Sequence, residues 1–527
     1  MNQLVLVLAI LLAAVIAESI SARIGVASSI MMTVFGCVLA LLPWVPQLKI
    51  PPHLILPLVL PPLLYAAARR TSWRQFAENW VAISMRAFGL VVVTAVAVAA
   101  AFHAWNPGVP IAVGMVLGSL TAPPDPVAAM AMAGKLGLPR RLIVPLGGEG
   151  LFNDVTAIVI YTVSVQAVVT GVFSPWHAVR DFIIAALVGG GVGLALGWVG
   201  GKLTQLLTTV TCEVSLSLLL PFIAYAVAEH WHGSGVLAVL VCALYLTDAL
   251  TKIANRDYRL VADAVWDIIE MLITGFAFGL IGLELQVVLQ TTKDEWSTMI
   301  GVSVAVVAII VLLRLVWLLA SWKLFLRYSK SYAADALSWQ EVIITWWAGM
   351  RGVATVALAL AVPFTIDTGA DFPARSQVLF VAFVLVLFTL LVQGPTLPWL
   401  VRITGVRVDT RQERAIERQL WTRVVHAELA TLKSIAKRDD VPEDVYVDIK
   451  DNLRRFSAKA DPEAADADEK AEAQMERIRQ RRDQIRHIRA EVAEAGRAEA
   501  LAARREPGMP PELVDEVIRR LDLGPTR

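Results

Sequence analysis

The chain has 527 residues, of which 57% are hydrophobic, against about 45–50% in soluble globular domains. Its formal net charge is only +1, so no excess of positive charge argues for a nucleic-acid partner. The three cysteines, Cys37, Cys212 and Cys242, have neither metal-ligand spacing nor the pattern of a disulfide framework. No phosphate loop, zinc spacing or nucleotide fingerprint occurs, so we expect no cofactor. The composition indicates a membrane protein.

Apolar runs of about 17–25 residues, near the length that spans a bilayer, recur from the N-terminus to about residue 405. The start, Met1-Asn2-Gln3-Leu4, lacks the basic region of a cleaved signal peptide, so we expect a retained first helix. The predicted spans are 3–20, 24–43, 52–68, 87–104, 111–134, 142–172, 178–201, 212–230, 235–250, 263–290, 298–321, 338–363 and 376–404. They predict an all-α membrane protein with about 13 transmembrane helices.

The basic residues between these spans predict an orientation. One set of alternate connections carries fifteen, namely Arg23, Arg69, Arg70, Arg74, Arg86, Lys135, Arg140, Arg141, Lys202, Lys252, Arg256, Arg259, Lys323, Arg327 and Lys330. The other set carries only Lys49, Arg180, Lys293 and Arg375. Since basic loops stay in the cytoplasm, we expect a multi-pass protein of the plasma (inner) membrane, with the N-terminus outside and the C-terminus inside.

The fifth predicted span is interrupted at mid-depth by Thr121-Ala122-Pro123-Pro124-Asp125-Pro126-Val127. Proline lacks an N–H and clashes with the preceding turn, so a continuous helix is not expected here. A carboxyl at bilayer depth costs about 2.5–3.5 kcal/mol on insertion scales, so Asp125 is a candidate functional residue. Unwound backbone at this depth must be buried in protein or line a wet cavity.

The twelfth predicted span has a matching interruption, Trp346-Trp347-Ala348-Gly349-Met350-Arg351-Gly352-Val353. Two interrupted segments far apart in the chain are typical of inverted-repeat transporters with a site near the membrane midplane. The inward-pointing N-termini of half-helices would help to hold a carboxylate ionised, and Arg351 would neutralise the opposing carbonyl ends.

The sixth predicted span contains a second intramembrane acid in Gly148-Glu149-Gly150-Leu151-Phe152-Asn153-Asp154. Burial disfavours the ionised form of a carboxyl, whereas a bound cation favours it, so Asp154 can hold a proton or a metal ion but not both easily. Hard cations such as sodium prefer oxygen ligands. We expect these from Asp154, the Asn153 carbonyl, Asp125 and the freed backbone carbonyls of Thr121, Ala122, Pro123 and Pro124.

Glu149 lies five residues before Asp154, on a different face of the helix, and would be costly if it stayed charged and unpaired. Arg314 is the only basic residue within the eleventh span, so we predict that it pairs with Glu149 and braces span six against span eleven. Arg351 is the alternative partner. We expect this pair to have an architectural role rather than a role in transport.

These segments together resemble the monovalent cation/proton antiporter family, in the branch of sodium/proton exchangers that has an Asn-Asp pair. The resemblance covers nearly all of residues 1–405. Its further motifs are Leu60-Pro61-Pro62-Leu63-Leu64-Tyr65, Ser234-Gly235-Val236-Leu237-Ala238-Val239, Gly279-Leu280-Ile281-Gly282-Leu283-Glu284-Leu285, Gly349-Met350-Arg351-Gly352 and Gln393-Gly394-Pro395-Thr396-Leu397.

The resemblance implies a thirteen-helix fold with a dimerisation domain and a mobile core domain. It also implies a homodimer and an elevator-like alternating-access cycle. It implies that Asp154 exchanges a cation for a proton with Asn153 as its partner, that Asp125 sits where the broken helices cross, and that exchange is electroneutral. Family members often have Thr before the first aspartate and Ser after the glutamate as cation ligands. Here Pro124 and Gly150 stand at these positions, which leaves the choice of cation open: sodium is the first choice, and potassium or lithium is the alternative.

Residues 406–527 carry 25 basic and 26 acidic residues, and we expect them to form a helical cytoplasmic tail with a regulatory or dimer-supporting role. Met475, Ile478, Ile485, Ile488 and Val492 recur at the spacing of a short helical seam. We therefore predict an antiporter rather than an enzyme. The alternative is a membrane sensor that has lost transport and signals through its tail.

Overall fold

The computed structural model describes two compact units, Met1–Val408 and Asp409–Arg527. In the first unit it describes residues 3–24, 27–42, 51–70, 80–125, 136–172, 175–253, 256–291, 296–328 and 337–406. In the second it describes short helical pieces at 423–424, 426–436, 442–443, 446–447 and 449–450. The helical seam predicted between Met475 and Val492 lies outside the described residues, as do residues 126–135 of the fifth predicted span.

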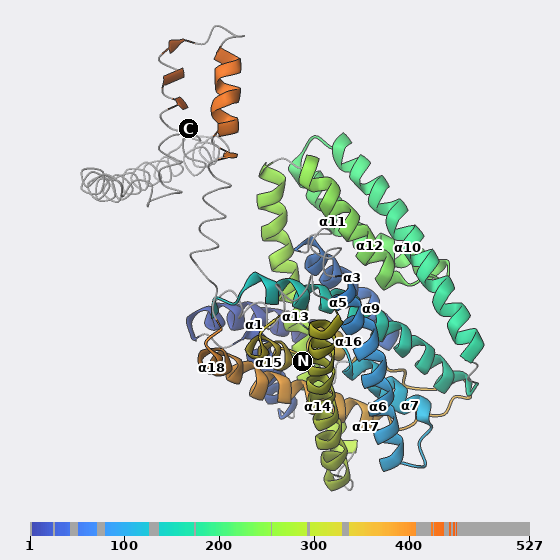
Figure 1. Ribbon diagram of the computed structural model, residues 1–527. Coiled ribbons are helices and arrows are strands. Elements are labelled where there is room, and N and C mark those ends of the chain that lie inside the picture. Colours follow the sequence, from blue (N-terminus) through green and yellow to red (C-terminus); the bar gives the residue numbers. More distant parts are fainter. Residues whose placement is uncertain are drawn as a thin grey trace, which may run out of the picture. The chain divides into compact units, whose positions relative to one another are not determined.

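The first unit is built from helices alone in its described part, apart from one isolated bridge between Thr365 and Asp371 (Figure 1). Its first half contains α1 (Gln3–Ile24), α2 (Ser28–Ala40), α3 (Pro52–Arg69), α5 (Trp80–Ser84), the π-helix η1 (Met85–Leu90), α6 (Val91–Trp105), α7 (Ile111–Thr121) and α9 (Arg140–Thr170). Its second half contains α10 (Pro175–Leu206), α11 (Val210–His230), α12 (Gly235–Ile253), α13 (Arg256–Thr291), α14 (Trp296–Tyr328), α15 (Trp339–Trp347), α16 (Val353–Leu360), α17 (Arg375–Phe388), the π-helix η2 (Thr389–Gln393) and α18 (Gly394–Thr404).

Each of the thirteen expected spans contains a described helix, which agrees with the predicted all-α fold class. Within the described residues, eight helices are long and apolar enough to cross a membrane. Three shorter apolar helices are Ser28–Ala40, Ile111–Thr121 and Gly235–Ala249. The number of crossings therefore stays a prediction, because α3 contains three prolines beyond its first residue and the fifth and twelfth spans are broken into shorter helices.

Local sequence explains where several of these helices begin and end. α15 begins with a capping box, in which the Ser338 hydroxyl accepts from the Glu341 N–H and the Glu341 carboxylate accepts from the Ser338 N–H. α9 and α18 end at Gly171 and Gly405, whose φ angles of 70° and 68° lie in the left-handed region that glycine adopts without strain. These signals fix the start of α15, the end of α9 and, at the edge of the first unit, the end of α18.

The core lies between two groups of helices. One group contains α1, α2 and α3 with α11, α12 and α13, and the other contains α6, α7 and α9 with α14 to α18. α10, α11 and α12 pack on one another along one edge of the unit (Figure 1). The short helix α16 packs against α3 and α13 from the first group and against α7, α9 and α17 from the second. This central position brings the second interruption next to the first.

Candidate functional site

The first interruption is a non-helical segment at the end of α7. The Thr121 hydroxyl donates to the Leu117 carbonyl at 2.7 Å and completes the last turn. Ala122 caps the helix by donating its N–H to the Gly118 carbonyl. Pro123 and Pro124 follow; they are buried and not helical, because consecutive prolines cannot continue the helical hydrogen-bond pattern. Asp125 follows, and its N–H donates to the Met350 carbonyl at 2.7 Å. The two interruptions are thus joined by a backbone hydrogen bond.

The second interruption directs the N-terminus of α16 at Asp125. The Val353 N–H, which opens α16, donates to Oδ2 of Asp125 at 3.2 Å. A Cβ atom at Gly352 would overlap with this carboxyl, so only glycine lets Asp125 approach so closely. The free N–H groups and the dipole at a helix N-terminus favour a negative charge, so the carboxylate of Asp125 is stabilised at this point.

Arg351 occupies the complementary position at the C-terminal end of α7. Its side chain is buried, with Nε donating to the Thr121 carbonyl at 2.7 Å and Nη1 donating to the Gly349 carbonyl at 2.8 Å. A cation at a helix C-terminus satisfies carbonyls that lack intrahelical partners. Arg351 thus lies on carbonyl ends, as expected, and is not the partner of Glu149.

Asn153 and Asp154 lie on α9 and adjoin the first interruption. Asn153 is fully buried, and its Nδ2 donates to the Pro124 carbonyl at 2.7 Å. Its Oδ1 atom has no hydrogen-bond donor among the residues that the structure describes. Asp154 is partly exposed, and its carboxyl lies near enough to Asp125 for the two charges to interact. One unpartnered amide oxygen and two carboxyls therefore gather beside the crossing.

The four carbonyls predicted as backbone ligands differ in their surroundings. The Thr121 carbonyl accepts from Arg351, and the Pro124 carbonyl accepts from Asn153. Each of these two oxygens keeps one lone pair for a cation. Ala122 and Pro123 lie between them and are buried.

The predicted contact between Glu149 and Arg314 is present. Arg314 Nη1 lies 2.5 Å from Glu149 Oε1, and the side chains are only 4% and 2% exposed. The pair joins α9 to α14, and Arg314 also donates to the Thr345 carbonyl of α15 at 3.3 Å. A Cβ atom at Gly349 would overlap with the Arg314 guanidinium. The two glycines of Gly349-Met350-Arg351-Gly352 thus make room for Arg314 and for Asp125.

The position of Arg86 differs from the one expected from the sequence. From the sequence, Arg86 is counted among the basic residues of a cytoplasmic connection. In the structure Arg86 lies in η1, its side chain is only 11% exposed, and its Nη1 lies 3.7 Å from Glu149 Oε2. The helix that carries it begins at Trp80 rather than near residue 87, so Arg86 lies within helical structure. Removing Arg86 from the count leaves a large excess of basic residues on the same set of connections.

A family model described as "Sodium/hydrogen exchanger, transmembrane" matches residues 7–403, which is most of the chain. The chain belongs to the sodium/hydrogen exchanger family. It is 32% identical to an uncharacterized Na(+)/H(+) exchanger of Mycobacterium tuberculosis (strain ATCC 25618 / H37Rv), over 98% of this chain and 94% of the relative.

Two further relatives of the exchanger have more specific names. The Low-affinity Na(+)/H(+) antiporter NhaS1 of Synechocystis sp. is 30% identical, over 79% of this chain and 76% of its own length. The Na(+)/H(+) antiporter ApNhaP of Aphanothece halophytica is also 30% identical, over 69% of this chain and 67% of its own length. None of these names supports the sensor alternative.

The fold of the exchanger is similar to that of the sodium proton antiporter MjNhaP1 from Methanocaldococcus jannaschii at pH 8. The TM-score is 0.59 at 19% identity, with 77% of this chain and 100% of the other chain covered. The predicted antiporter fold is therefore confirmed at the level of architecture.

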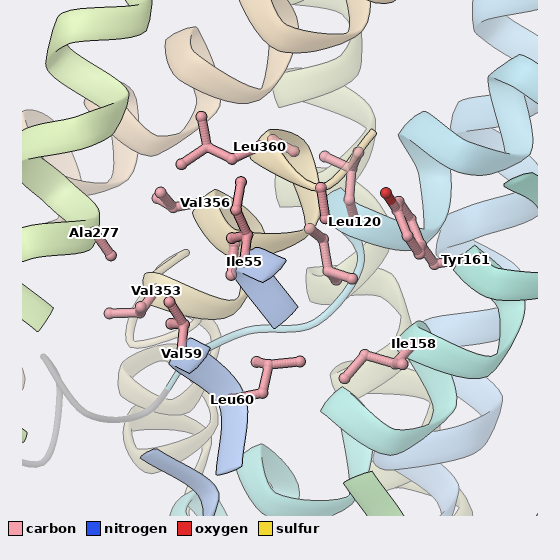
Figure 2. Close-up of a cluster of buried hydrophobic side chains, with 14 of the residues drawn as sticks. Ile55, Val59, Leu60, Leu120, Ile158, Tyr161, Ala277, Val353, Val356 and Leu360 are labelled. Carbon is pink, nitrogen blue, oxygen red and sulfur yellow. The ribbon is translucent and has the colours of Figure 1, made fainter. Parts of the chain in front are cut away.

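Buried apolar side chains from both helix groups form a cluster beside the N-terminus of α16 (Figure 2). Ile158 and Tyr161 follow Asp154 by four and seven residues on α9, which places them on the same helix face. Figure 2 shows them in one cluster with Leu120 of α7 and Leu360 of α16. The other labelled members come from α3, α13 and α16, namely Ile55, Val59, Leu60, Ala277, Val353 and Val356, and no member of the labelled cluster is more than 7% exposed. The apolar cluster thus packs the two helix groups against each other.

A second ion pair of the exchanger, between the exposed Arg141 and the buried Glu341, was not predicted from the sequence. Glu341 is 1% exposed, and its Oε1 lies 2.7 Å from Nη2 of Arg141. This contact joins the first turn of α15 to the first turn of α9. The sequence signal was the Ser-x-x-Glu capping box at Ser338, which predicts the role of Glu341 as a cap but gives no hint of Arg141, 200 residues away.

Proposed function

We propose that the protein is a secondary antiporter that exchanges a monovalent cation, with sodium as the first choice and potassium or lithium as alternatives, for protons at Asp154. The observation that carries this proposal is the juxtaposition of Asp154, the unpartnered Oδ1 of Asn153 and the Asp125 carboxyl beside two interrupted helices. Oxygen ligands of this kind suit hard cations. The printed names of NhaS1 and ApNhaP, both Na(+)/H(+) antiporters, support the same function.

The surroundings of the two aspartates give them different roles. Asp125 accepts a hydrogen bond from the backbone at the N-terminus of α16, a position that favours a negative charge on its carboxyl. Asp154 adjoins an apolar cluster, where a proton or a bound cation neutralises a charge that is costly to leave uncompensated. Because a proton and a cation neutralise the same carboxylate, binding of one displaces the other. This competition couples the two fluxes, and loading by one cation or one proton gives electroneutral 1:1 exchange.

Asn153 acts as the partner of Asp154 in this proposal. The Asn153 amide nitrogen donates to the Pro124 carbonyl. The Asn153 Oδ1 atom points away from this bond and is available as a ligand. The lone pairs left on the carbonyls of Thr121 and Pro124 and the carbonyls of Ala122 and Pro123 are further ligands. Backbone oxygens then replace the hydroxyls absent at Pro124 and Gly150.

Glu149 and Arg314 support the site without binding the transported ion. Their pair ties α9 to α14, and Arg314 continues to α15, so the helix that carries Asp154 moves together with the second interruption. We infer an alternating-access cycle in which this group of helices moves as one body against the group of α1 to α3 and α11 to α13. The proposed assembly is a homodimer in the plasma (inner) membrane, with the N-terminus outside and a cytoplasmic tail from residue 406 that supports the dimer or regulates transport.

Transport assays in reconstituted vesicles test this proposal. With an imposed pH gradient, addition of sodium, potassium or lithium salts should dissipate the gradient in the wild-type protein, and Asp154→Asn should abolish the response. Asp371→Asn, which neutralises an exposed acid in the loop before α17, is the matched control and should keep it. A wild-type protein that responds to none of the cations would contradict the proposed function, and a rate that depends on membrane potential would contradict 1:1 stoichiometry.

A further inference from the structure

A file of acids on α13 precedes Ala277 of the apolar cluster on the same helix face. Asp263, Asp267 and Glu270 are spaced by four and three residues, which places them on one helix face. The side chains of Asp263 and Asp267 are 70% and 66% exposed, whereas that of Glu270 is only 14% exposed. Glu270 precedes Ala277 by seven residues, about two turns of α13, and Ala277 lies in the apolar cluster with Val353, whose N–H donates to Asp125. The innermost acid of the file therefore lies about two helical turns from the apolar cluster beside the candidate site.

Two arginines at the end of α3 face these acids. Arg69 Nη2 lies 2.5 Å from Asp263 Oδ1, and its Nη1 donates to the Ala262 carbonyl, so Arg69 is held in place. Arg70 is shared, because its Nη2 lies 2.8 Å from Asp267 Oδ1 and 2.8 Å from Glu270 Oε2. The Arg70 side chain is 51% exposed, which leaves it room to move between the two carboxylates.

The two partners of Arg70 are not equivalent. Asp267 is well solvated and needs no partner, so its contact with Arg70 contributes little to stability. Glu270 is largely shielded from water, so its charge interacts more strongly with any cation that reaches it. A small movement of Arg70 toward Asp267 exchanges one ion pair for another and frees Glu270.

We propose that Arg70 is a movable counter-charge that alternates between Asp267 and Glu270, and that Glu270, when released, receives the transported cation on its way to Asp125 and Asp154. This inference rests on the proposed antiport. When Arg70 returns to Glu270, its positive charge displaces the cation toward the aspartates and closes this route. Glu270 thus binds the cation as it enters from the side at which α3 ends, which is the cytoplasmic side in the proposed orientation.

Sided transport kinetics test this role. Sodium-dependent proton movement is measured in right-side-out and inside-out vesicles, and the half-saturating sodium concentration is determined on each face. Glu270→Gln should raise this concentration about three- to fivefold on the cytoplasmic face alone, the size expected for losing one partly exposed charge, with an unchanged maximal rate. Asp267→Asn should also raise the half-saturating sodium concentration on the cytoplasmic face, because Arg70 then stays paired with Glu270.

The double variant Arg70→Gln/Asp267→Asn distinguishes this role from a structural one. Removing Arg70 frees Glu270 again, so the half-saturating concentration should return toward the wild-type value. Asp263→Asn is the matched control, because it removes the same charge from the same helix face but contacts Arg69 instead of Arg70, and it should have no effect.

Three results would overturn the inference. They are an unchanged half-saturating concentration in Glu270→Gln, an equal change on both faces of the membrane, and an equal change in Asp263→Asn, which would indicate a surface-charge effect. In each case wild-type exchange that is abolished by Asp154→Asn would leave the proposed function intact. A wild-type protein without exchange would contradict the proposed function itself.

Discussion

The buried pair of Glu149 and Arg314 gives a quantitative prediction, because an exposed pair of the same length occurs in the same molecule. Both pairs have an N–O distance of 2.5 Å, but Glu149 and Arg314 are 2% and 4% exposed, whereas Asp263 is 70% exposed beside Arg69. Removing one partner of a buried pair costs about 3–5 kcal/mol because the remaining charge is left uncompensated. Removing one partner of an exposed pair costs about 0–1 kcal/mol.

We therefore expect Arg314→Met and Glu149→Gln each to lower the free energy of unfolding by about 3–5 kcal/mol. The contact of Arg86 with Glu149 at 3.7 Å is too long to replace the lost hydrogen bond in Arg314→Met. The double variant Glu149→Gln/Arg314→Met should cost less than the sum of the single changes, because it removes both charges of the closer pair together and leaves only Arg86 without its contact to Glu149. Asp263→Asn is the control and should change stability by less than about 1 kcal/mol.

The assay is equilibrium unfolding in mixed detergent micelles, followed by tryptophan fluorescence, with purified wild-type protein and the four variants. Single and double variants whose losses simply add would refute the argument, since additivity means that the two side chains do not interact. A loss in Asp263→Asn as large as that in Arg314→Met would also refute it, because burial would then not decide the strength of the pair.

Three further predictions concern the site itself. Gly352→Ala should strongly reduce exchange while the protein still folds, because the added Cβ displaces the Asp125 carboxyl from the N-terminus of α16; normal exchange in this variant would show that their contact is dispensable. Asn153→Ala should raise the half-saturating sodium concentration, because it removes a cation ligand and the donor to the Pro124 carbonyl, and an unchanged value would exclude Asn153 as a ligand. The half-saturating sodium concentration should rise as the pH falls, because protons then occupy Asp154 in place of sodium; a value independent of pH would contradict a shared site.

The sequence predicts much of the fold and the position of the two interruptions. Repeated apolar runs gave the all-α class, and consecutive prolines predicted the end of α7 near Thr121. The pair of Glu149 and Arg314 could be predicted because each charge lies alone in an apolar stretch, so each needs a partner. The family resemblance was confirmed over residues 7–403.

Other features could not be predicted because they depend on how distant helices meet. Arg141 and Glu341 lie near the ends of predicted spans, where solvated charges are expected, and only the packed structure brings them together. Arg86 was placed in a connection because hydropathy does not show that its helix begins at Trp80. Likewise, the sequence does not show that position 352 must be glycine. That requirement arises because the carboxyl of Asp125, 227 residues earlier in the chain, packs against the Gly352 backbone.

Proton movement in vesicles that contain Asp154→Asn is the most direct test of the central claim, which is that one carboxylate binds the proton and the cation alternately. Purified wild-type and variant proteins are reconstituted at equal density, and sodium is added against an imposed pH gradient. The account predicts that sodium dissipates the gradient in wild-type vesicles and in Asp371→Asn vesicles, and that Asp154→Asn vesicles behave like empty ones. Sodium-dependent dissipation at the wild-type rate in the Asp154→Asn protein would contradict it.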